Sequence, residues 1–330
     1  MNPNRRAVAS IALAALLAGT ASLATAQDTA ANYPDKPIRI VVGFPSGQAI
    51  DGVARYFAQK LGEELKQPVI VDNRAGASGI IAHELVKNAE PDGYTLLITS
   101  GATMAINPAL FKKLPYDPIK DFAPVILTNT TPMFLAVNAG TPINSFQQMV
   151  AYAKARPGKL AYGSGGSGLT QHIAMEMLKK AADIDLLHVP YKGSPAMVTD
   201  LIGGQVQFAF DTSTSILPHA TNGRVKLLGV TSLTRSAAAP NVPTLAEQGL
   251  PGFEALTWAG LVAPARTPRA IVEKVNAAMN HVLKTPATAT YLAGIGATPA
   301  GGSVGDFDQF IRKELTRWGK AVKDSGAQVD

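Results

Sequence analysis

Hydrophobic residues recur along this chain in two patterns. Short, β-branched apolar runs, of which 38–42 is the first, predict buried strands. Between such runs, apolar residues at three- and four-residue spacing predict amphipathic helices, and the first such series is Ile50, Val53, Phe57, Leu61 and Leu65. Strands that alternate with helices of this length are typical of α/β proteins with mostly parallel sheets.

The order of these patterns predicts two lobes. Further strands are expected at 69–71, 94–99, 125–129, 134–137, 160–162, 186–189, 206–210, 227–231 and 253–262. Further helices are expected at 80–88, 146–155, 169–182, 194–201, 269–284 and 304–322, while 107–120 and 232–252 are expected to be irregular. The chain is expected to cross near 130 and return near 255. Residues 33–130 plus 256–330 then form a discontinuous lobe, and 131–255 form an inserted lobe.

The stretch 159–182 carries the strongest local signal for binding. A short strand leads into a loop with glycines at 163, 165, 166 and 168, and a helix follows. A helix N-terminus has unpaired N–H groups and a partial positive charge, so it attracts anions. Ser164, Ser167 and Thr170 add hydroxyls, and His172 lies one turn into the helix, either as a ligand contact or as a packing residue. By itself, the stretch is equally typical of a tight turn with a Ser or Thr cap.

The first strand leads into a second loop of the same design. Phe44, Ser46, Gly47 and Gln48 precede a helix whose first turn contains Asp51, which either complements the helix dipole or faces a cleft. Ligands in open α/β sheets bind where the carboxyl ends of strands meet helix N-termini. The two loops, one in each lobe, are therefore expected to face each other across a cleft.

The composition excludes several classes of protein. The 330 residues include no cysteine, which excludes thiol catalysis, disulfides and cysteine-ligated zinc. Residues 1–26, with Arg5 and Arg6 before a short apolar run and a small-residue cleavage site, are typical of a secretory signal peptide, so the mature chain is expected in the periplasm. Its removal lowers the formal net charge from +6 to +4. With scattered basic residues and 6% aromatics, nucleic-acid binding is not expected.

No motif for catalysis or a cofactor is complete. Residues 163–168 match G-x-G-x-x-G, but Asp183 and Asp185 precede the next strand, whereas a dinucleotide site needs its acid at the carboxyl end of that strand. No G-x-S-x-G elbow surrounds a serine, and no lysine follows the glycines as in a phosphate-binding loop. The five histidines lack metal spacing. The sequence therefore predicts no catalytic residues, no metal and no cofactor.

A longer series of motifs extends from residue 33 to residue 325. It includes Gly43-Phe44-Pro45, Asn73-Arg74, Pro91-Asp92-Gly93-Tyr94, Arg156-Pro157-Gly158 and His188-Val189-Pro190-Tyr191-Lys192-Gly193-Ser194. In these motifs the chain resembles the Bug-type extracytoplasmic solute receptors of tripartite tricarboxylate transporters, the TctC family. The resemblance implies a two-lobed periplasmic-binding-protein fold of the flytrap, type II-like kind, which closes on a small carboxylate and delivers it to a membrane transporter.

The resemblance also implies a set of ligand-binding residues. In the family, one ligand carboxylate lies between the first strand–helix loop and the Gly-rich loop of the other lobe, held by backbone amides, hydroxyls and ordered waters. On this chain these positions are Phe44, Ser46, Gly47, Gln48 and Asp51 in the first loop and Ser164, Gly165, Gly166, Ser167, Thr170 and His172 in the second, with Ser100, Tyr191, Lys192 and Asp211 along the rest of the site.

The first loop departs from the family pattern. The usual run is Gly-Gly-Gly-Thr-Asp, whereas this chain has Gly47-Gln48-Ala49-Ile50-Asp51. The ligand therefore stays open among di- and tricarboxylates, aromatic acids and amino acids. The expected partners are that ligand and the membrane subunits of the transporter, with the receptor itself a monomer. Two alternatives remain: a receptor that presents its ligand to a sensor kinase, and a periplasmic hydrolase or lyase.

Overall fold

The computed structural model describes residues 32–326, so the expected signal peptide lies outside the described residues. The strands are β1 (Ile38–Val42), β2 (Val69–Asn73), β3 (Thr95–Ser100), β4 (Phe122–Asn138), β5 (Ala161–Ser164), β6 (Leu187–Pro190), β7 (Phe208–Thr212), β8 (Val225–Val230), β9 (Leu256–Pro264) and β10 (Thr298–Pro299). The α-helices are α2 (Ala49–Leu65), α3 (Ile80–Lys87), α4 (Asn107–Leu110), α5 (Phe146–Lys154), α6 (Thr170–Ala182), α7 (Ser194–Ile202), α8 (Ser213–Thr221), α9 (Arg269–Leu283), α10 (Pro286–Gly294) and α11 (Val304–Ser325). A 3-10 turn (Ala77–Gly79) precedes α3, and a π-helical turn (Ala102–Ile106) precedes α4.

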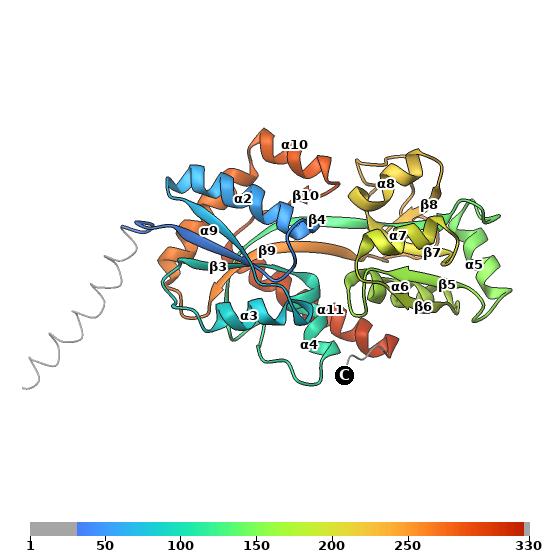
Figure 1. Ribbon diagram of the computed structural model, residues 1–330, viewed down its shortest axis with the longest axis horizontal. Helices are drawn as coiled ribbons and strands as arrows, with labels where there is room; N and C mark the ends of the chain where they lie inside the picture. The colour runs from blue at the N-terminus through green and yellow to red at the C-terminus, as the bar shows by residue number, and fades with distance from the viewer. Residues whose placement is uncertain (1–31, 327–330) are drawn as a thin grey trace, which may run out of the picture.

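The strands form one hydrogen-bonded path, β2-β1-β3-β9-β4-β7-β5-β6, with β8 and β10 also paired to β4. Figure 1 shows two lobes along this path, connected by β4 and the chain that enters β9. Lobe 1 contains β1, β2, β3, β9 and the start of β4, and lobe 2 contains β5 to β8 and the end of β4. The partner of β4 changes from β9 to β7 and β8 between Pro132 and Met133.

The strand directions determine which edge of each sheet faces the other lobe. In lobe 1, β1, β2 and β3 are parallel, β3 is antiparallel to β9, and β9 is antiparallel to β4. β3 therefore runs in the same direction as β4, toward lobe 2. In lobe 2, β5, β6 and β7 are parallel, and β7 is antiparallel to β4, so these strands run toward lobe 1. The carboxyl ends of both parallel sets face the opposite lobe.

The register of β4 gives the separation of these ends. Ser100, the last residue of β3, pairs with Ala259, which pairs with Asn129 of β4. Thr212, the last residue of β7, pairs with Met133. Asn129 and Met133 are four residues apart along β4, which corresponds to a distance of about 13 Å along the strand. This spacing suits a small molecule held between loops that extend from both edges.

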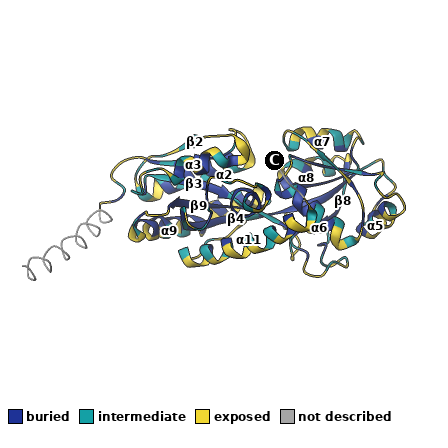
Figure 2. Ribbon diagram, turned by 90° about the horizontal axis from the view of Figure 1, so that it is seen from below, coloured by how far each residue is buried: buried dark blue, intermediate teal, exposed yellow. Residues whose placement is uncertain are grey.

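Helices cover both faces of each sheet, so the central strands are buried between two layers, whereas the edge strands β2 and β6 are partly exposed (Figure 2). In lobe 1, α2, α9 and α10 pack on one face and α3 and the first half of α11 on the other. In lobe 2, α5 and α6 pack on one face and α7 and α8 on the other. This arrangement is the α/β layering that the alternating pattern of the sequence predicts.

α11 contributes to the cores of both lobes. Its residues Phe307 and Ile311 lie in a core cluster of lobe 1, and Trp318 lies in the main cluster of lobe 2. Between them, Glu314 is 2% exposed, and its Oε2 accepts hydrogen bonds from the indole N–H groups of Trp258, at 3.0 Å, and Trp318, at 2.9 Å. Because α11 is shared in this way, the expected lobe boundaries stay a prediction.

The structure differs from the sequence-based expectations at several elements, among them β10 and the turns before α3 and α4, which the sequence does not predict. The two strands expected at 125–129 and 134–137 are one strand, β4. Pro132 is the last β4 residue that pairs with β9, so its missing N–H falls at the end of that ladder, and the next residue begins the pairing with β7. The segment expected to be irregular, 107–120, begins with α4. Neither α8 nor α10 was expected. The sequence of α8 is rich in Ser and Thr and contains Pro218, and its Ile216 is held in the core of lobe 2.

Replacing Glu314 by Ala is expected to lower the free energy of unfolding by about 3 kcal/mol. Two indole N–H groups and the guanidinium of Arg317, which lies 2.9 Å from the carboxylate, lose a buried acceptor. Glu314→Gln keeps one acceptor oxygen and is expected to lose less. Urea denaturation followed by circular dichroism measures both.

The matched control is Asp308→Ala, which removes a partly exposed ion pair with Arg312 on the same helix. It is expected to change the free energy of unfolding by less than ~0.5 kcal/mol. If Glu314→Ala and Asp308→Ala lower the free energy of unfolding equally, Glu314 does not stabilise the packing of α11.

Candidate functional site

The loop between β1 and α2 is held from within by Asp51. This carboxylate is 3% exposed, and its Oδ2 accepts hydrogen bonds from the Gly47 N–H at 2.9 Å, the Arg55 Nε at 3.0 Å and the Ser46 hydroxyl at 3.3 Å. Its Oδ1 accepts from Asn73 Nδ2 at 2.8 Å. Burial acts to raise the pKa of Asp51, but these hydrogen bonds outweigh it and lower the pKa to about 2. Asp51 is therefore an anion that faces its own loop.

The outer side of this loop offers backbone donors. Ser46, Gly47, Gln48 and Ala49 are exposed, and Gln48 precedes α2 without a side-chain cap. Among the described residues, the amides of Ala49 and Ile50 donate to no group. The N-terminus of α2 therefore presents unpaired N–H groups and the positive end of the helix dipole.

The Gly-rich loop between β5 and α6 is also held from within. The Ser164 hydroxyl is buried, lies 2.7 Å from His188 Nε2 and donates to the Gly166 carbonyl at 3.0 Å. At the other end of the loop, the Gly168 N–H donates to His172 Nδ1 at 3.0 Å. Ser167 between them is exposed. Within residues 32–326, the amides of Ser167 and Thr170 have no hydrogen-bond acceptor.

Gly168 has a conformation and a contact that require glycine. Its φ of +78° lies in the left-handed region, and a Cβ at this position would lie 2.1 Å from Leu110 Cδ2. Leu110 belongs to α4 of lobe 1 and is buried with residues of lobe 2. The Gly-rich loop of lobe 2 is therefore in direct contact with lobe 1.

Asp211 is the most deeply buried of the predicted site residues at the remaining strand ends. It is 1% exposed, and its Oδ1 accepts hydrogen bonds from Gln171 Nε2 at 3.0 Å and from the Thr212 N–H at 2.8 Å. Its Oδ2 has no partner in the part of the chain that the structure describes. Burial raises the pKa of Asp211, against the lowering effect of the Thr212 amide. The Gln171 amide also donates to the Ser194 hydroxyl, at 3.1 Å, and so links α6 to the start of α7.

The other predicted residues have different orientations. The Tyr191 hydroxyl donates to Asp200 on α7 at 2.7 Å, whereas the Tyr191 backbone N–H donates to the Ser164 carbonyl at 2.9 Å. Lys192 is exposed. The Ser100 hydroxyl lies 3.3 Å from that of Thr103. Tyr191 thus contacts the Gly-rich loop through its backbone.

The structure therefore links some of the predicted residues and not others. Hydrogen bonds connect Ser46 and Gly47 to Asp51, and they connect Gly166 and Tyr191 to Ser164. The structure shows Ser167 and Lys192 only as exposed, and Ser100 contacts the helical turn that follows it.

Five partners were missed by the sequence reasoning: Arg55, Asn73, Gln171, His188 and Ser194. Arg55 lies four residues after Asp51 on α2, and this spacing is a readable signal for an ion pair. Gln171 and Asp211 are separated by 40 residues and no spacing rule connects them.

Cationic side chains close to the first loop are already paired. Arg55 contacts Asp51 at 3.0 Å, and Arg74 contacts Asp72 at 2.9 Å. A carboxylate at this loop would therefore meet backbone N–H groups before it met a guanidinium. Such an arrangement binds an anion without a buried, unpaired cation in the empty site.

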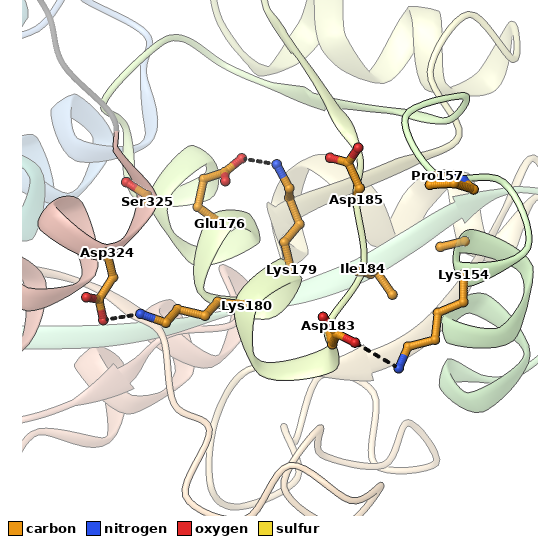
Figure 3. Close-up of a pocket in the computed structure, with 11 residues that line it drawn as sticks. Lys154, Pro157, Glu176, Lys179, Lys180, Asp183, Ile184, Asp185, Asp324 and Ser325 are labelled. Carbon is orange, nitrogen blue, oxygen red and sulfur yellow. Dashed lines mark hydrogen bonds and ion pairs between the residues drawn. The ribbon is translucent and has the colours of Figure 1, made fainter.

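A separate hollow of about 750 Å³ lies in lobe 2 beside the end of α11. Figure 3 shows that its lysines pair with acids: Lys154 with Asp183, Lys179 with Glu176 and Lys180 with Asp324. It contains none of the residues predicted to bind a ligand. The two loops, rather than this hollow, form the candidate site.

Comparison with known proteins adds to this geometry. The model of one family, described as tripartite tricarboxylate transporter family receptor, matches residues 53–327. The solved structure of Rhodopseudomonas palustris Rpa4515 with adipate is 35% identical, with a TM-score of 0.83 over 90% of this chain and 100% of that chain. MatC of the same organism, with bound malate, is 32% identical, with a TM-score of 0.78 over 88% and 100%. The periplasmic binding protein BugD is 31% identical, with a TM-score of 0.79 over 90% and 100%. The expected periplasmic-binding-protein fold is confirmed.

Asp51→Asn is expected to lower the free energy of unfolding at pH 7 by roughly 2 kcal/mol, because the pKa falls from 3.8 to about 2 on folding. A carboxyl group whose pKa is lowered on folding stabilises the fold above its unfolded pKa and loses this effect as the pH falls toward its folded pKa. The difference between wild type and variant is therefore expected to narrow between pH 4 and pH 2. Urea denaturation at several pH values measures it.

Glu63→Gln is the control, because Glu63 is an exposed acid on the same helix. It is expected to change the free energy of unfolding by less than ~0.5 kcal/mol at pH 7. A constant difference between Asp51→Asn and wild type at all pH values would contradict the assignment of an ionised, loop-holding Asp51.

Proposed function

The chain belongs to the tripartite tricarboxylate transporter receptor family, and we propose that it captures a small dicarboxylate between its two lobes. It then delivers this ligand, as a monomer, to the membrane subunits of such a transporter. The members of this family are periplasmic solute receptors.

The observation that carries this proposal is the pair of helix N-termini on facing sheet edges. α2 offers the unpartnered amides of Ala49 and Ile50, and α6 offers those of Ser167 and Thr170. Because the strands before these helices run toward each other, both groups of donors lie on the sides of the lobes that face one another. Unpaired N–H groups at a helix N-terminus are a ready-made site for an anion.

A dicarboxylate has the chemistry that this donor set requires. Each carboxylate oxygen accepts charge-assisted hydrogen bonds from N–H groups, and two carboxylates allow contacts to both lobes. The related structures of Rpa4515 with adipate and MatC with malate support this class, because both ligands are dicarboxylates of different lengths. The altered run Gly47-Gln48-Ala49-Ile50 leaves the length that this chain prefers open.

Binding to both lobes couples the ligand to closure. A hydrogen bond to a charged group is worth roughly 1.5–3 kcal/mol, and a helix N-terminus contributes up to about 2 kcal/mol in a partly buried setting. A ligand that touches both loops obtains the full set only when the lobes are close. It therefore shifts the equilibrium toward the closed form, which the transporter then recognises.

Ser164 and His188 lie at a distance typical of a nucleophile and its base, 2.7 Å. Three observations argue against catalysis. Ser164 is fully buried, and its hydroxyl donates a hydrogen bond to the Gly166 carbonyl. Burial and the neighbouring His172 and Lys179 lower the pKa of His188 to about 4, which makes it a weak base at neutral pH. We expect the bound acid to be released chemically unchanged.

The proposed location is the periplasm. The family consists of periplasmic receptors, and the features of residues 1–26 are those of a signal peptide. Over residues 32–326, every helix is too short or too polar to span a bilayer. The family and the features of residues 1–26 support an exported receptor that meets its transporter at the membrane surface.

Ser167→Asp is expected to separate binding from stability. A carboxylate at the N-terminus of α6 repels an anionic ligand and occupies the amides that would hold it, so the affinity for adipate or malate is expected to fall roughly tenfold or more. The same substitution is expected to leave thermal stability nearly unchanged, because Ser167 is exposed and lies before the N-cap residue of α6. Titration calorimetry and thermal denaturation measure the two effects.

Asn144→Asp is the matched control. It makes the same change of charge beside the N-terminus of α5, at the far end of lobe 2 (Figure 1), and is expected to leave affinity unchanged. If Ser167→Asp binds the ligand as tightly as wild type, the assigned site is wrong. If no mono-, di- or tricarboxylate raises the melting temperature of the wild type, the proposed ligand class is wrong.

A further inference from the structure

Two histidines from different elements stack against each other beside the Gly-rich loop. The ring of His172, on α6, lies 3.8 Å from the ring of His188, on β6, with an angle of 7° between the ring planes. Tyr162 of β5 lies 4.9 Å from His188 at an angle of 20°. His172 is 8% exposed and Tyr162 is fully buried. Three neighbouring elements of lobe 2 thus meet through aromatic rings.

The two imidazoles contact opposite ends of the loop. His188 Nε2 lies 2.7 Å from the hydroxyl of Ser164, the last residue of β5. His172 Nδ1 accepts a hydrogen bond from the N–H of Gly168, two residues before α6. The segment between these contacts, 165–167, is part of the proposed anion site. The pair therefore fixes both ends of that segment.

The hydrogen bond at His172 requires an uncharged ring. Because the Gly168 N–H is a donor, His172 Nδ1 must be unprotonated, and the neutral ring carries its proton on Nε2. Protonation of Nδ1 would place two donors against each other and remove this bond. It would also place a charge 3.8 Å from the second imidazole, in a site with little water. Protonation is thus expected to release the loop at Gly168.

The surroundings of the pair keep both rings neutral. Burial lowers the pKa of His172, although Glu176 on the same helix acts in the opposite direction and Lys179 adds to the lowering. Burial, His172 and Lys179 lower the pKa of His188 to about 4. Glu176 is itself held by the Tyr162 hydroxyl and by Lys179. From α11, Asp324 faces α6 and pairs with Lys180.

We propose that His172 and His188 are positioning residues, which hold the loop from Ser164 to Gly168 in its anion-binding conformation through an uncharged, stacked imidazole pair. His172 then acts through Gly168 rather than by touching the ligand. The proposal rests on the proposed function for its effect on binding. Its effect on the loop itself does not require a ligand.

Two substitutions of His172 separate the hydrogen bond from the packing. His172→Phe keeps an aromatic ring for stacking but removes the acceptor, so the affinity for adipate or malate is expected to fall roughly tenfold or more. His172→Gln restores an uncharged acceptor and is expected to recover most of the affinity. If the role were packing alone, His172→Phe would bind better than His172→Gln, and that order of affinities would overturn the proposal. His219→Gln on α8 is the matched control and is expected to bind as wild type does.

The pH profile provides a second test. The ratio of the dissociation constants of wild type and His172→Gln cancels the titration of the ligand. This ratio is expected to be constant at alkaline pH and to rise only as the pH falls below the ordinary histidine pKa of 6.5, because only the wild type has an imidazole to protonate at residue 172 and burial lowers its pKa. An affinity of the wild type that increases relative to His172→Gln on acidification would identify His172 as a cationic ligand contact and overturn the proposal.

A measurement on the ligand-free wild type needs neither a ligand nor a variant. In nuclear magnetic resonance, the Gly168 amide signal is expected to shift with the same midpoint as the His172 ring, below the ordinary histidine value of 6.5. A Gly168 signal that does not follow the ring overturns the proposal. If the amide follows the ring but no carboxylate binds, the positioning role stands and the proposed function fails.

Discussion

The antiparallel pairing of β4 with β9 is the constraint on which the candidate site depends. β4 runs through both lobes as one strand and pairs with β9 in lobe 1 and with β7 in lobe 2. Because it is one strand, it sets the direction of every other strand relative to a common axis. The parallel strands of each lobe therefore end toward the opposite lobe, and each loop that follows them extends into the space between. Without this pairing, the two helix N-termini would have no fixed relation to each other.

In both loops, the polar side chains maintain the shape of the backbone. Asp51 accepts hydrogen bonds from Gly47, Arg55 and Asn73, and the imidazoles of His172 and His188 hold the ends of the Gly-rich loop. The unpaired backbone amides of the two loops, which cannot change charge, are the donors of the proposed carboxylate site. Such a site has no buried cation that requires compensation when it is empty.

The lobes also touch beside β4, and these contacts restrict how they can move. On one side, Leu110 of α4 packs against Gly168. On the other, the Ser213 hydroxyl at the start of α8 donates to the Ile295 carbonyl after α10, at 2.8 Å. α11 adds a third connection through Glu314 and its two tryptophan partners. The Leu110 and Ser213 contacts both lie between residues of different lobes, so a separation of the lobes at either place would break the contact there.

The sequence by itself determined the local elements and the two loops. The apolar run 38–42 coincides with β1, α5 lies within the helix expected at 146–155, and both Gly-containing loops lead into helices, because periodicity and glycine act over a few residues. Only the tertiary structure decided that Asp51 faces its own loop, that β4 continues past Pro132 and that Gln171 of α6 reaches Asp211 of β7. Those outcomes depend on contacts between residues far apart in the chain. Such contacts leave no spacing pattern, because their energy depends on the burial and strand pairing that folding creates.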